Sequence, residues 1–260
     1  MKRMRPALSM MLLVFLVNPW VSSAASTEPP SHLIAQEKKK IEASGDLQPI
    51  PQERKSGSGT GMPVYSPPFR GAPAGRVGGG TRGSGDEKAH LQVLAPDHVG
   101  LTIQHQPSLY WFLSGPSAYP LEFTLIENKA AKPMLEKRLE SCNNSGLQCI
   151  RLSDHGVSLQ PDVLYQWFVA LVPDAERRSK DILSGGFIKR IQPPGGLEQT
   201  PDEGGKTRMV HIYADAGLWY DAFMTVCHLI EIFPDDVHLR QMRASLLEQV
   251  GLDQVAKDLK

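Results

Sequence analysis

Three glycines, Gly78, Gly80 and Gly83, stand in the stretch GRVGGGTRGSG at the spacing G-x-G-x-x-G. In dinucleotide-binding folds this spacing lets the backbone approach a pyrophosphate, provided that a buried strand precedes the glycines and a helix follows them. Here PPFRGAPAGRV precedes and SGDEKAHLQVL follows, and Ser84 stands where a P-loop requires Lys. We therefore expect no nucleotide site and no cofactor.

The same glycine-rich stretch is better explained as a structural lead-in to the first strands of the fold. Glycines let the backbone lie close to neighbouring strands, and the guanidinium of Arg82 is placed to donate to carbonyls or to a carboxylate. The residues of this structural signature are Gly78, Gly79, Gly80, Thr81, Arg82 and Gly83.

Histidine and cysteine show no pattern typical of a metal site or of nucleophilic catalysis. The chain has eight His and three Cys, and none of them forms an H-E-x-x-H or C-x-x-C motif. No G-x-S-x-G sequence marks a serine nucleophile. Cys227 is a candidate thiol nucleophile together with His211. Its position beside Val226 and Leu229 instead favours a buried, inert thiol. We expect no metal and no catalytic residue.

Paired carboxylates are explained by helix ends rather than by acid–base chemistry. Asp235 and Asp236 follow Pro234 at an expected helix start, and Asp221 lies near another. Carboxylates there cap free backbone N–H groups and interact favourably with the helix dipole. These carboxylates therefore do not favour a hydrolase. A hydrolase without a recognised motif is the least favoured interpretation of the protein's function.

Cys142 and Cys149 flank the segment NNSGLQ, whose Ser145 and Gly146 are typical of a two-residue hairpin turn. In that hairpin Cys142 lies directly opposite Cys149, and an exported protein would close the pair as a disulfide. Two free thiols are the alternative. Cys227 stays unpaired in both cases.

The N-terminus has the three parts of a secretory signal peptide. Three basic residues precede an apolar run over residues 7–17, and small residues follow. We expect cleavage at Ala24 or Ala25, so that residues 1–25 are removed. An uncleaved anchor is the alternative, but it would need about 20 apolar residues. No second long apolar run follows, which predicts an exported, periplasmic or extracellular protein without an integral membrane span after signal cleavage.

Residues 26–86 are predicted to form a disordered leader. Fifteen of the 35 residues at 51–85 are Gly or Pro, and few apolar side chains are available for burial. Such a segment cannot bury enough surface to offset the entropy of ordering it.

Residues 87–195 have the short, regularly spaced strands of an antiparallel β-sandwich. Eight segments are rich in aromatic or β-branched residues and are separated by turn residues: 89–95, 99–103, 108–113, 121–127, 134–140, 147–152, 163–172 and 186–191. Tyr165 and Trp167 belong to the pattern L-x-P-x-x-x-Y-x-W-x-V, which looks like the passage into the penultimate strand of immunoglobulin and fibronectin-III domains. There the Tyr hydroxyl bonds backbone a few residues upstream, and Trp111 would be the buried aromatic of the third strand.

The aromatic residues of these strands have a second interpretation, an exposed platform for sugar rings. Alternation along the strands favours core packing, because the large side chains fall on one face. The platform remains an alternative for Tyr110, together with the loop residue Tyr119.

A linker over 196–206 precedes a helical segment over 207–260 that resembles a tetratricopeptide unit. Gly217 and Ala222 stand at the turn and small-residue offsets of that repeat, and GLWYDA is echoed 34 residues later by GLDQVA. We expect a helical hairpin plus an extra helix. Because one and a half repeats cannot close a core alone, these helices should dock on the sandwich. The predicted fold class is α+β, mainly β.

The order of these motifs resembles the bacterial family called domain of unknown function 928. The resemblance runs from about Arg76 to Lys260 through GGGTRG, YWF, LEFTLIE, the Tyr-x-Trp passage, GGFIKRI, YADAGLWYDA and LLEQVGL. It implies export and a shared fold but no activity. Many members carry one Cys after the glycine-rich stretch and another at the end of the Tyr-x-Trp strand. In this sequence the corresponding segments are RGSGD and ALVPD, and neither contains a Cys. The resemblance implies that the two cysteines form a disulfide in the members that carry them.

These observations predict an exported, non-catalytic accessory protein of the cell envelope that binds another extracytoplasmic protein in a sensory or envelope context. Trp219, Tyr220 and Tyr110 are the candidate partner surface, and packing of the helices on the sandwich is the alternative for the first two. The second functional interpretation is a glycan- or peptidoglycan-binding sandwich module. With 28 basic and 28 acidic residues, the chain has no general attraction for nucleic acid.

Overall fold

The computed structural model describes residues 61–67, 75–78, 89–139, 145–195, 197 and 207–260. Every described residue belongs to one compact unit, Gly57–Lys260. The predicted signal peptide, most of the predicted leader and linker, and Cys142 lie outside the described residues. So do five residues of the glycine-rich signature: Gly79, Gly80, Thr81, Arg82 and Gly83.

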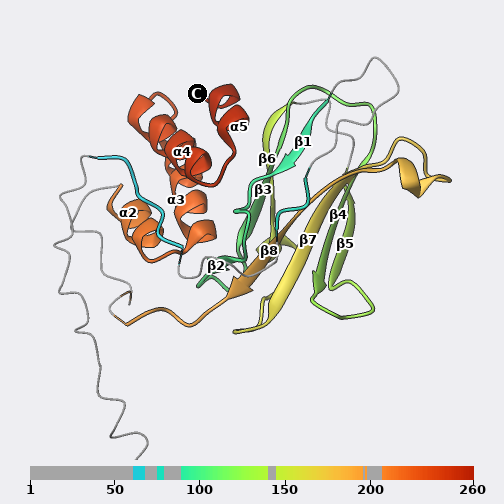
Figure 1. The fold of residues 1–260 in the computed structure, drawn as a ribbon, viewed down its shortest axis with the longest axis horizontal. Helices are drawn as coiled ribbons and strands as arrows, with labels where there is room; N and C mark the ends of the chain where they lie inside the picture. The colour runs from blue at the N-terminus through green and yellow to red at the C-terminus, as the bar shows by residue number, and fades with distance from the viewer. Residues whose placement is uncertain (1–60, 68–74, 79–88, 140–144, 196, 198–206) are drawn as a thin grey trace, which may run out of the picture. The chain divides into compact units, whose positions relative to one another are not determined.

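Eight strands of the described chain form two sheets (Figure 1). The smaller sheet is antiparallel and has the order β1-β3-β6, with β1 at Leu91–Val93, β3 at Ser108–Leu113 and β6 at Gly146–Arg151. The larger sheet has the order β2-β8-β7-β4-β5, with β2 at Gly100–Thr102, β8 at Ile182–Arg190, β7 at Leu164–Leu171, β4 at Leu121–Glu127 and β5 at Leu135–Leu139. Its strands pair antiparallel except β2, which runs parallel to β8. Two short 3-10 helices lie between strands, η1 at Leu152–His155 and η2 at Arg178–Lys180.

All eight strands expected from the sequence are present, and their alternating side chains fill one core. Along β4, Leu121, Phe123 and Leu125 are buried while the residues between them are half-buried. On the neighbouring β7, Trp167 is fully buried, with its ring centroid 6.2 Å from that of Phe123. This period of two follows from the pleat, which sends successive side chains to opposite faces.

The passage into β7 contains the tyrosine contact expected from the sequence pattern. Tyr165 is buried, and its hydroxyl accepts a hydrogen bond of 3.0 Å from the backbone N–H of Gln160, five residues upstream. Trp111 of β3 is buried as expected, and its indole N–H donates to Gln148 Oε1 at 3.0 Å. These aromatic side chains can be buried because their polar atoms have partners.

Four α-helices follow in the described chain: α2 (Arg208–Asp215), α3 (Trp219–Ile232), α4 (Val237–Gln249) and α5 (Asp253–Asp258). Gly217 after α2 and Gly251 after α4 have φ values of 73° and 71°, a left-handed conformation that favours glycine where a helix ends. Asp236 caps α4, because its carboxylate accepts hydrogen bonds from the N–H groups of His238 and Leu239. None of the helices in this part of the chain is long and apolar enough to cross a membrane.

The helices pack on the sheets, as predicted. α3 contacts β2 and β3, and Figure 1 shows the orange and red helices beside the smaller sheet and β2. Because the helices cover one face of β3, all six of its residues are buried. Tyr110 of β3 lies edge-on to Phe223 of α3, with 5.4 Å between ring centroids. The class is therefore α+β, with two mostly antiparallel sheets and helices packed on them.

The hairpin predicted around Ser145 and Gly146 is not formed by the described strands. β5 pairs with β4 in the larger sheet, whereas β6 pairs with β3 in the smaller one. Cys149 lies opposite Tyr110 and carries a free thiol, and its expected disulfide partner Cys142 is outside the described residues. Residues 140–144, which include the first strand of the predicted hairpin, lie outside the described residues, so the hairpin and its disulfide stay predictions.

Part of the leader predicted to be disordered is ordered. Residues 61–67 lie extended along the helices, as the cyan segment in Figure 1 shows. Farther along, Val77 forms an antiparallel bridge with Gly185 of β8. A few well-placed side chains and backbone bonds order these two stretches, and the average composition of residues 26–86 does not reveal them.

Candidate functional site

A short stretch of the N-terminal part of the chain packs on the helices, and we call residues 61–67 the strap. Its side chains alternate in exposure: Pro63 and Tyr65 are buried, whereas Val64 between them is exposed. This alternation is that of an extended chain, in which successive side chains point to opposite sides. The strap therefore presents every second side chain to the helices.

The backbone of the strap is bonded to two helices. The Tyr65 N–H donates to Gln249 Oε1 at 2.8 Å, and Gln249 Nε2 donates to the Pro63 carbonyl at 2.8 Å. The Ser66 N–H donates to the carbonyl of Ala214 in α2 at 3.0 Å. One side-chain amide at the end of α4 thus pairs with both a donor and an acceptor of the strap backbone.

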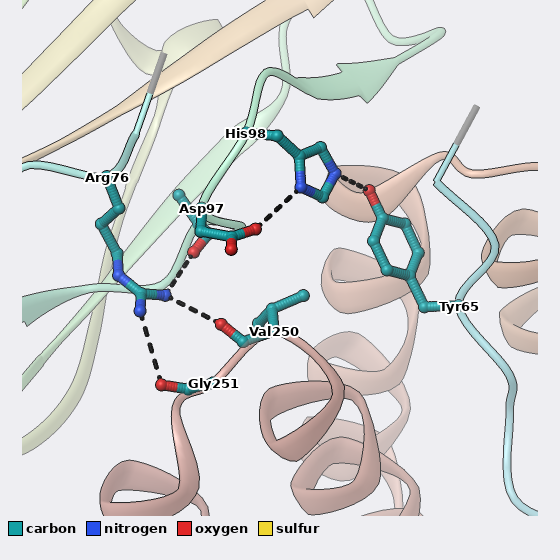
Figure 2. Close-up of polar contacts among 7 residues, drawn as sticks. Tyr65, Arg76, Asp97, His98, Val250 and Gly251 are labelled. Carbon is teal, nitrogen blue, oxygen red and sulfur yellow. Dashed lines mark hydrogen bonds and ion pairs between the residues drawn. The ribbon is translucent and has the colours of Figure 1, made fainter. Parts of the chain in front are cut away.

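The Tyr65 side chain begins a chain of polar contacts, shown in Figure 2. Its hydroxyl lies 2.9 Å from His98 Nε2, and His98 Nδ1 lies 3.0 Å from Asp97 Oδ1. If the His98 proton is on Nδ1, the ring donates to Asp97 and accepts from the Tyr65 hydroxyl. Burial, with a smaller contribution from Asp97, raises the pKa of Tyr65, so the side chain is a neutral phenol.

Tyr65, His98 and Asp97 are, in this order, residue types that can serve as the nucleophile, the general base and the orienting carboxylate of an active site. The surroundings of Tyr65 argue against that use. Its ring is buried, stacks with His98 and packs edge-on to Trp219 at 5.3 Å between centroids. A raised pKa also disfavours the phenolate that a nucleophile needs. The contacts therefore hold the strap in place.

Arg76 joins the sheets to the helices beside this cluster (Figure 2). One of its terminal nitrogens donates to the carbonyl of Ala95 at 2.9 Å and to that of Val250 at 3.2 Å. The other donates to the Gly251 carbonyl at 3.4 Å. Carbonyls at the end of a helix lack partners within the helix, so Arg76 supplies donors where α4 needs them. Burial lowers the pKa of Arg76, and nearby Asp97 opposes that shift.

The sequence profile of the family Domain of Unknown Function (DUF928) matches residues 77–259. The chain belongs to this family. The matched range contains both sheets and all four helices of the described chain, whereas the strap and Arg76 precede it. No curated protein matches the chain.

In this DUF928 chain, the residues predicted as a partner surface are packed inside. Trp219 and Tyr220 are buried at the start of α3. The Trp219 indole N–H donates to the Leu94 carbonyl at 3.3 Å. The Tyr220 hydroxyl donates to the Phe187 carbonyl at 2.9 Å and accepts from the Trp167 indole at 3.0 Å. These residues dock α3 on the sheets, so the partner-surface prediction was wrong and the packing alternative is correct.

Asp221, the next residue of α3, has a role that the sequence analysis missed. It is fully buried, and its Oδ2 accepts a hydrogen bond of 3.2 Å from the backbone N–H of Ile103, which follows the edge strand β2. Within the described residues its Oδ1 has no hydrogen-bond partner. Burial raises the pKa of Asp221 to about 7, partly offset by hydrogen bonds from the β2 side. The carboxyl therefore joins α3 to the residue that follows β2.

Tyr110 does not form an exposed platform for sugar rings. It is buried against α3, and Tyr119 is half-buried beside the core. The sequence showed alternation along the strand but not that helices cover the second face. Gly78, the described residue of the glycine-rich signature, is exposed, and a Cβ there would meet nothing within 4 Å, so close packing does not require glycine at that position.

The described part of this DUF928 chain contains two free thiols, Cys149 and Cys227. Cys227 is buried on α3, and burial raises its pKa to about 12, which leaves it protonated. Burial also raises the pKa of Cys149. The described residues contain no group of three or more His, Cys, Asp or Glu side chains that could hold a metal ion.

The strap contacts were not predicted from the sequence. Tyr65, His98 and Gln249 are far apart in the chain. Arg76 and Gln249 lie within stretches that the sequence singled out, GRVGGGTRGSG and LLEQVGL, but neither residue was predicted to contact the strap or the sheets. The available signal was local: Met62, Val64 and Tyr65 are apolar or aromatic residues within a stretch otherwise rich in Gly, Pro and Ser.

Proposed function

We propose that this DUF928 chain is an exported, non-catalytic protein of the cell envelope that binds another extracytoplasmic protein in a sensory or envelope context. The proposal includes cleavage of residues 1–25 as a signal peptide. It also includes an immunoglobulin- or fibronectin-III-like arrangement of the two sheets and a tetratricopeptide-like arrangement of the helices.

The observation that carries the binding proposal is a group of exposed apolar side chains at the turn between α3 and α4. We call Ile232, Phe233 and Val237 the apolar tip; they are 52%, 41% and 55% exposed. Eight large hydrophobic side chains of the described chain are exposed, and three of them lie within residues 232–237. Single exposed apolar residues are ordinary, but a cluster is typical of a contact surface.

The local structure supports presentation of the apolar tip as a fixed surface. It lies between two helices, and α4 starts with the Asp236 cap immediately beside it. Asp235 is exposed, so charge borders the apolar residues. An apolar centre with a polar rim is the arrangement found in many protein interfaces.

Two contacts support the finer fold assignment. The bond between the Gln160 N–H and the Tyr165 hydroxyl has the form of a tyrosine corner in sandwich domains. Gly217 and Gly251 both have positive φ and are each followed by a buried Leu, at a separation equal to the tetratricopeptide period of 34 residues.

The test is crosslinking in the native cell followed by identification of the captured proteins. The double variant Ile232→Ser, Val237→Ser should capture the partner at least about tenfold less than the wild type, since two interface side chains each contribute on the order of 1 kcal/mol. The matched control Met134→Ser changes an exposed apolar residue just before β5 and should capture normally. Equal capture by the double variant, or no specific capture by the wild type, would contradict the proposal.

A further inference from the structure

The strap is held in the way that proteins hold a peptide ligand. It is extended, it buries alternate side chains, and its backbone is bonded at Tyr65, Pro63 and Ser66. In recognition of extended peptides, backbone hydrogen bonds provide affinity and sites for alternate side chains provide specificity. We call the residues that contact the strap the receiving surface: His98, Ala214, Trp219 and Gln249.

Gln249 is oriented to read a polypeptide backbone. Its Oε1 accepts from the Tyr65 N–H and its Nε2 donates to the Pro63 carbonyl, both at 2.8 Å. The same Nε2 also donates to the Ser245 carbonyl one turn earlier at 3.0 Å, which fixes the direction of the amide. These bonds do not depend on which side chains the peptide carries, so any extended chain with the same path can make them.

The contacts of the Tyr65 side chain select a tyrosine. Its ring packs against Trp219, and its hydroxyl meets His98, which is in turn bonded to Asp97. A phenylalanine would fill the same space but would leave His98 Nε2 without this partner. Pro63 is the other buried strap residue, so the preferred sequence has the form Pro-x-Tyr.

The strap lies outside the part of the chain that the DUF928 profile matches, whereas the receiving surface lies within it. The match begins at residue 77, and every residue of the receiving surface falls between 77 and 259. The residues that match the family profile therefore include the receiving surface but not the strap. This separates the occupant from the surface that it occupies.

We propose that the receiving surface binds an extended Pro-x-Tyr segment of an extracytoplasmic partner protein, and that the strap is a competing ligand from the same chain which keeps the surface closed. The inference rests on the proposed function, because it takes the partner to be a polypeptide. It adds a binding surface separate from the apolar tip, and a form of regulation.

Competition with the strap sets the expected affinities. A segment tethered by a short linker acts at an effective concentration in the millimolar range. An external peptide binds only the fraction of molecules whose strap is open, so its apparent affinity is reduced by that fraction. Weakening the strap without altering the receiving surface should therefore strengthen binding of an external peptide.

The experiment uses the full chain and a fluorescently labelled synthetic peptide with the strap sequence GMPVYSP, followed by anisotropy. Tyr65→Ala should bind the peptide at least about tenfold more tightly than the wild type. The matched control Val64→Ala changes a strap residue that is 66% exposed and should bind as the wild type does. Adding Gln249→Ala to Tyr65→Ala should weaken binding by about tenfold or more.

Ser66→Pro is the second opening variant, in case Tyr65→Ala does not fold. It removes the N–H that donates to Ala214, and proline is compatible with an extended segment. Failure of the folded opening variants to bind the peptide better than the wild type would overturn the proposal. Binding that survives Gln249→Ala would also overturn it.

Two further results separate this proposal from others. Dimerisation of the wild type that depends on Gln249 would mean that copies exchange straps, which overturns the assignment to a foreign partner. The peptide experiment does not involve the apolar tip. If the peptide does not bind while crosslinking through the apolar tip still captures a partner, this inference is overturned and the proposed function stands. If the peptide binds while the variants of the apolar tip capture the partner normally, the apolar tip is not the binding surface.

Discussion

Asp221 is a buried carboxyl whose protonation is coupled to folding. Its pKa is about 7 in the folded protein because it is desolvated, against an ordinary value near 3.8. A group that binds its proton more tightly in the folded state stabilises the fold when it is protonated. The contribution of Asp221 is therefore complete below about pH 4 and is lost as the pH rises through about 7.

We expect the free energy of unfolding to decrease between about pH 5 and about pH 8, with Asp221 contributing about 2–3 kcal/mol to the decrease. Asp221→Asn keeps the size and an acceptor oxygen for the Ile103 N–H but cannot ionise, so its stability should vary less over this range. Urea unfolding of both proteins at the two pH values measures the difference.

Asp215→Asn is the control, because it makes the same chemical change at an exposed residue of α2. It should leave the pH dependence of the wild type unchanged. Parallel pH dependences in the wild type and Asp221→Asn would show that Asp221 does not titrate in this range.

The contact between β2 and α3 depends on a residue without a side chain. A Cβ at Gly100 would lie 2.5 Å from Cε2 of Tyr220 and 3.2 Å from Cδ of Pro96. The Tyr220 ring has little freedom to move, because its hydroxyl is bonded to Trp167 and Phe187. Close approach of strand and helix therefore requires glycine at this position.

Gly100→Ala should lower the free energy of unfolding by about 1–3 kcal/mol through overpacking of the helix–sheet contact. Gly115→Ala is the matched control, since a Cβ there meets nothing within 4 Å, and its effect should stay within about 0.5 kcal/mol. Thermal or urea unfolding distinguishes them. Equal stability of the two variants would mean that α3 can shift away from β2 at no cost.

At the scale of the described unit, several hydrogen bonds link the helices to the sheets and to the loops beside them. The links include Trp219 to Leu94, Tyr220 to Phe187 and Asp221 to Ile103. Arg76 adds a further link, since it bonds the loop before β2 and the turn between α4 and α5 with a single guanidinium. This link is made by a residue just before the family match.

Arg76→Ala should loosen the C-terminal end of the unit. We expect faster amide hydrogen exchange in α5 and in the preceding turn, and a loss of stability of about 1–3 kcal/mol, because the partly buried bonds from Arg76 to the Ala95 and Val250 carbonyls are lost. Arg76→Lys should be intermediate, since one ammonium cannot reproduce the geometry of a guanidinium. The exposed Lys132→Ala is the control. Unchanged exchange over residues 250–258 in Arg76→Ala would exclude this role.

Local features of the fold were predictable from the sequence alone. The period-two pattern around Tyr165 and Trp167 predicted a strand with a buried face, and Gly217 predicted the end of a helix. The cap at Asp236 was predicted in the same way. Each of these depends on residues within a few positions of one another, so the physical cause is contained in the local sequence.

Burial of a second face and the choice of strand partner were decided only by the tertiary structure. Tyr110 and Trp219 are buried because α3 covers β3, and the strand containing Cys149 pairs with β3 rather than with the strand before it. The strap is ordered by Gln249, 184 residues away from Tyr65. Local patterns specify which face of an element is apolar, but what covers that face depends on contacts between segments far apart in the chain.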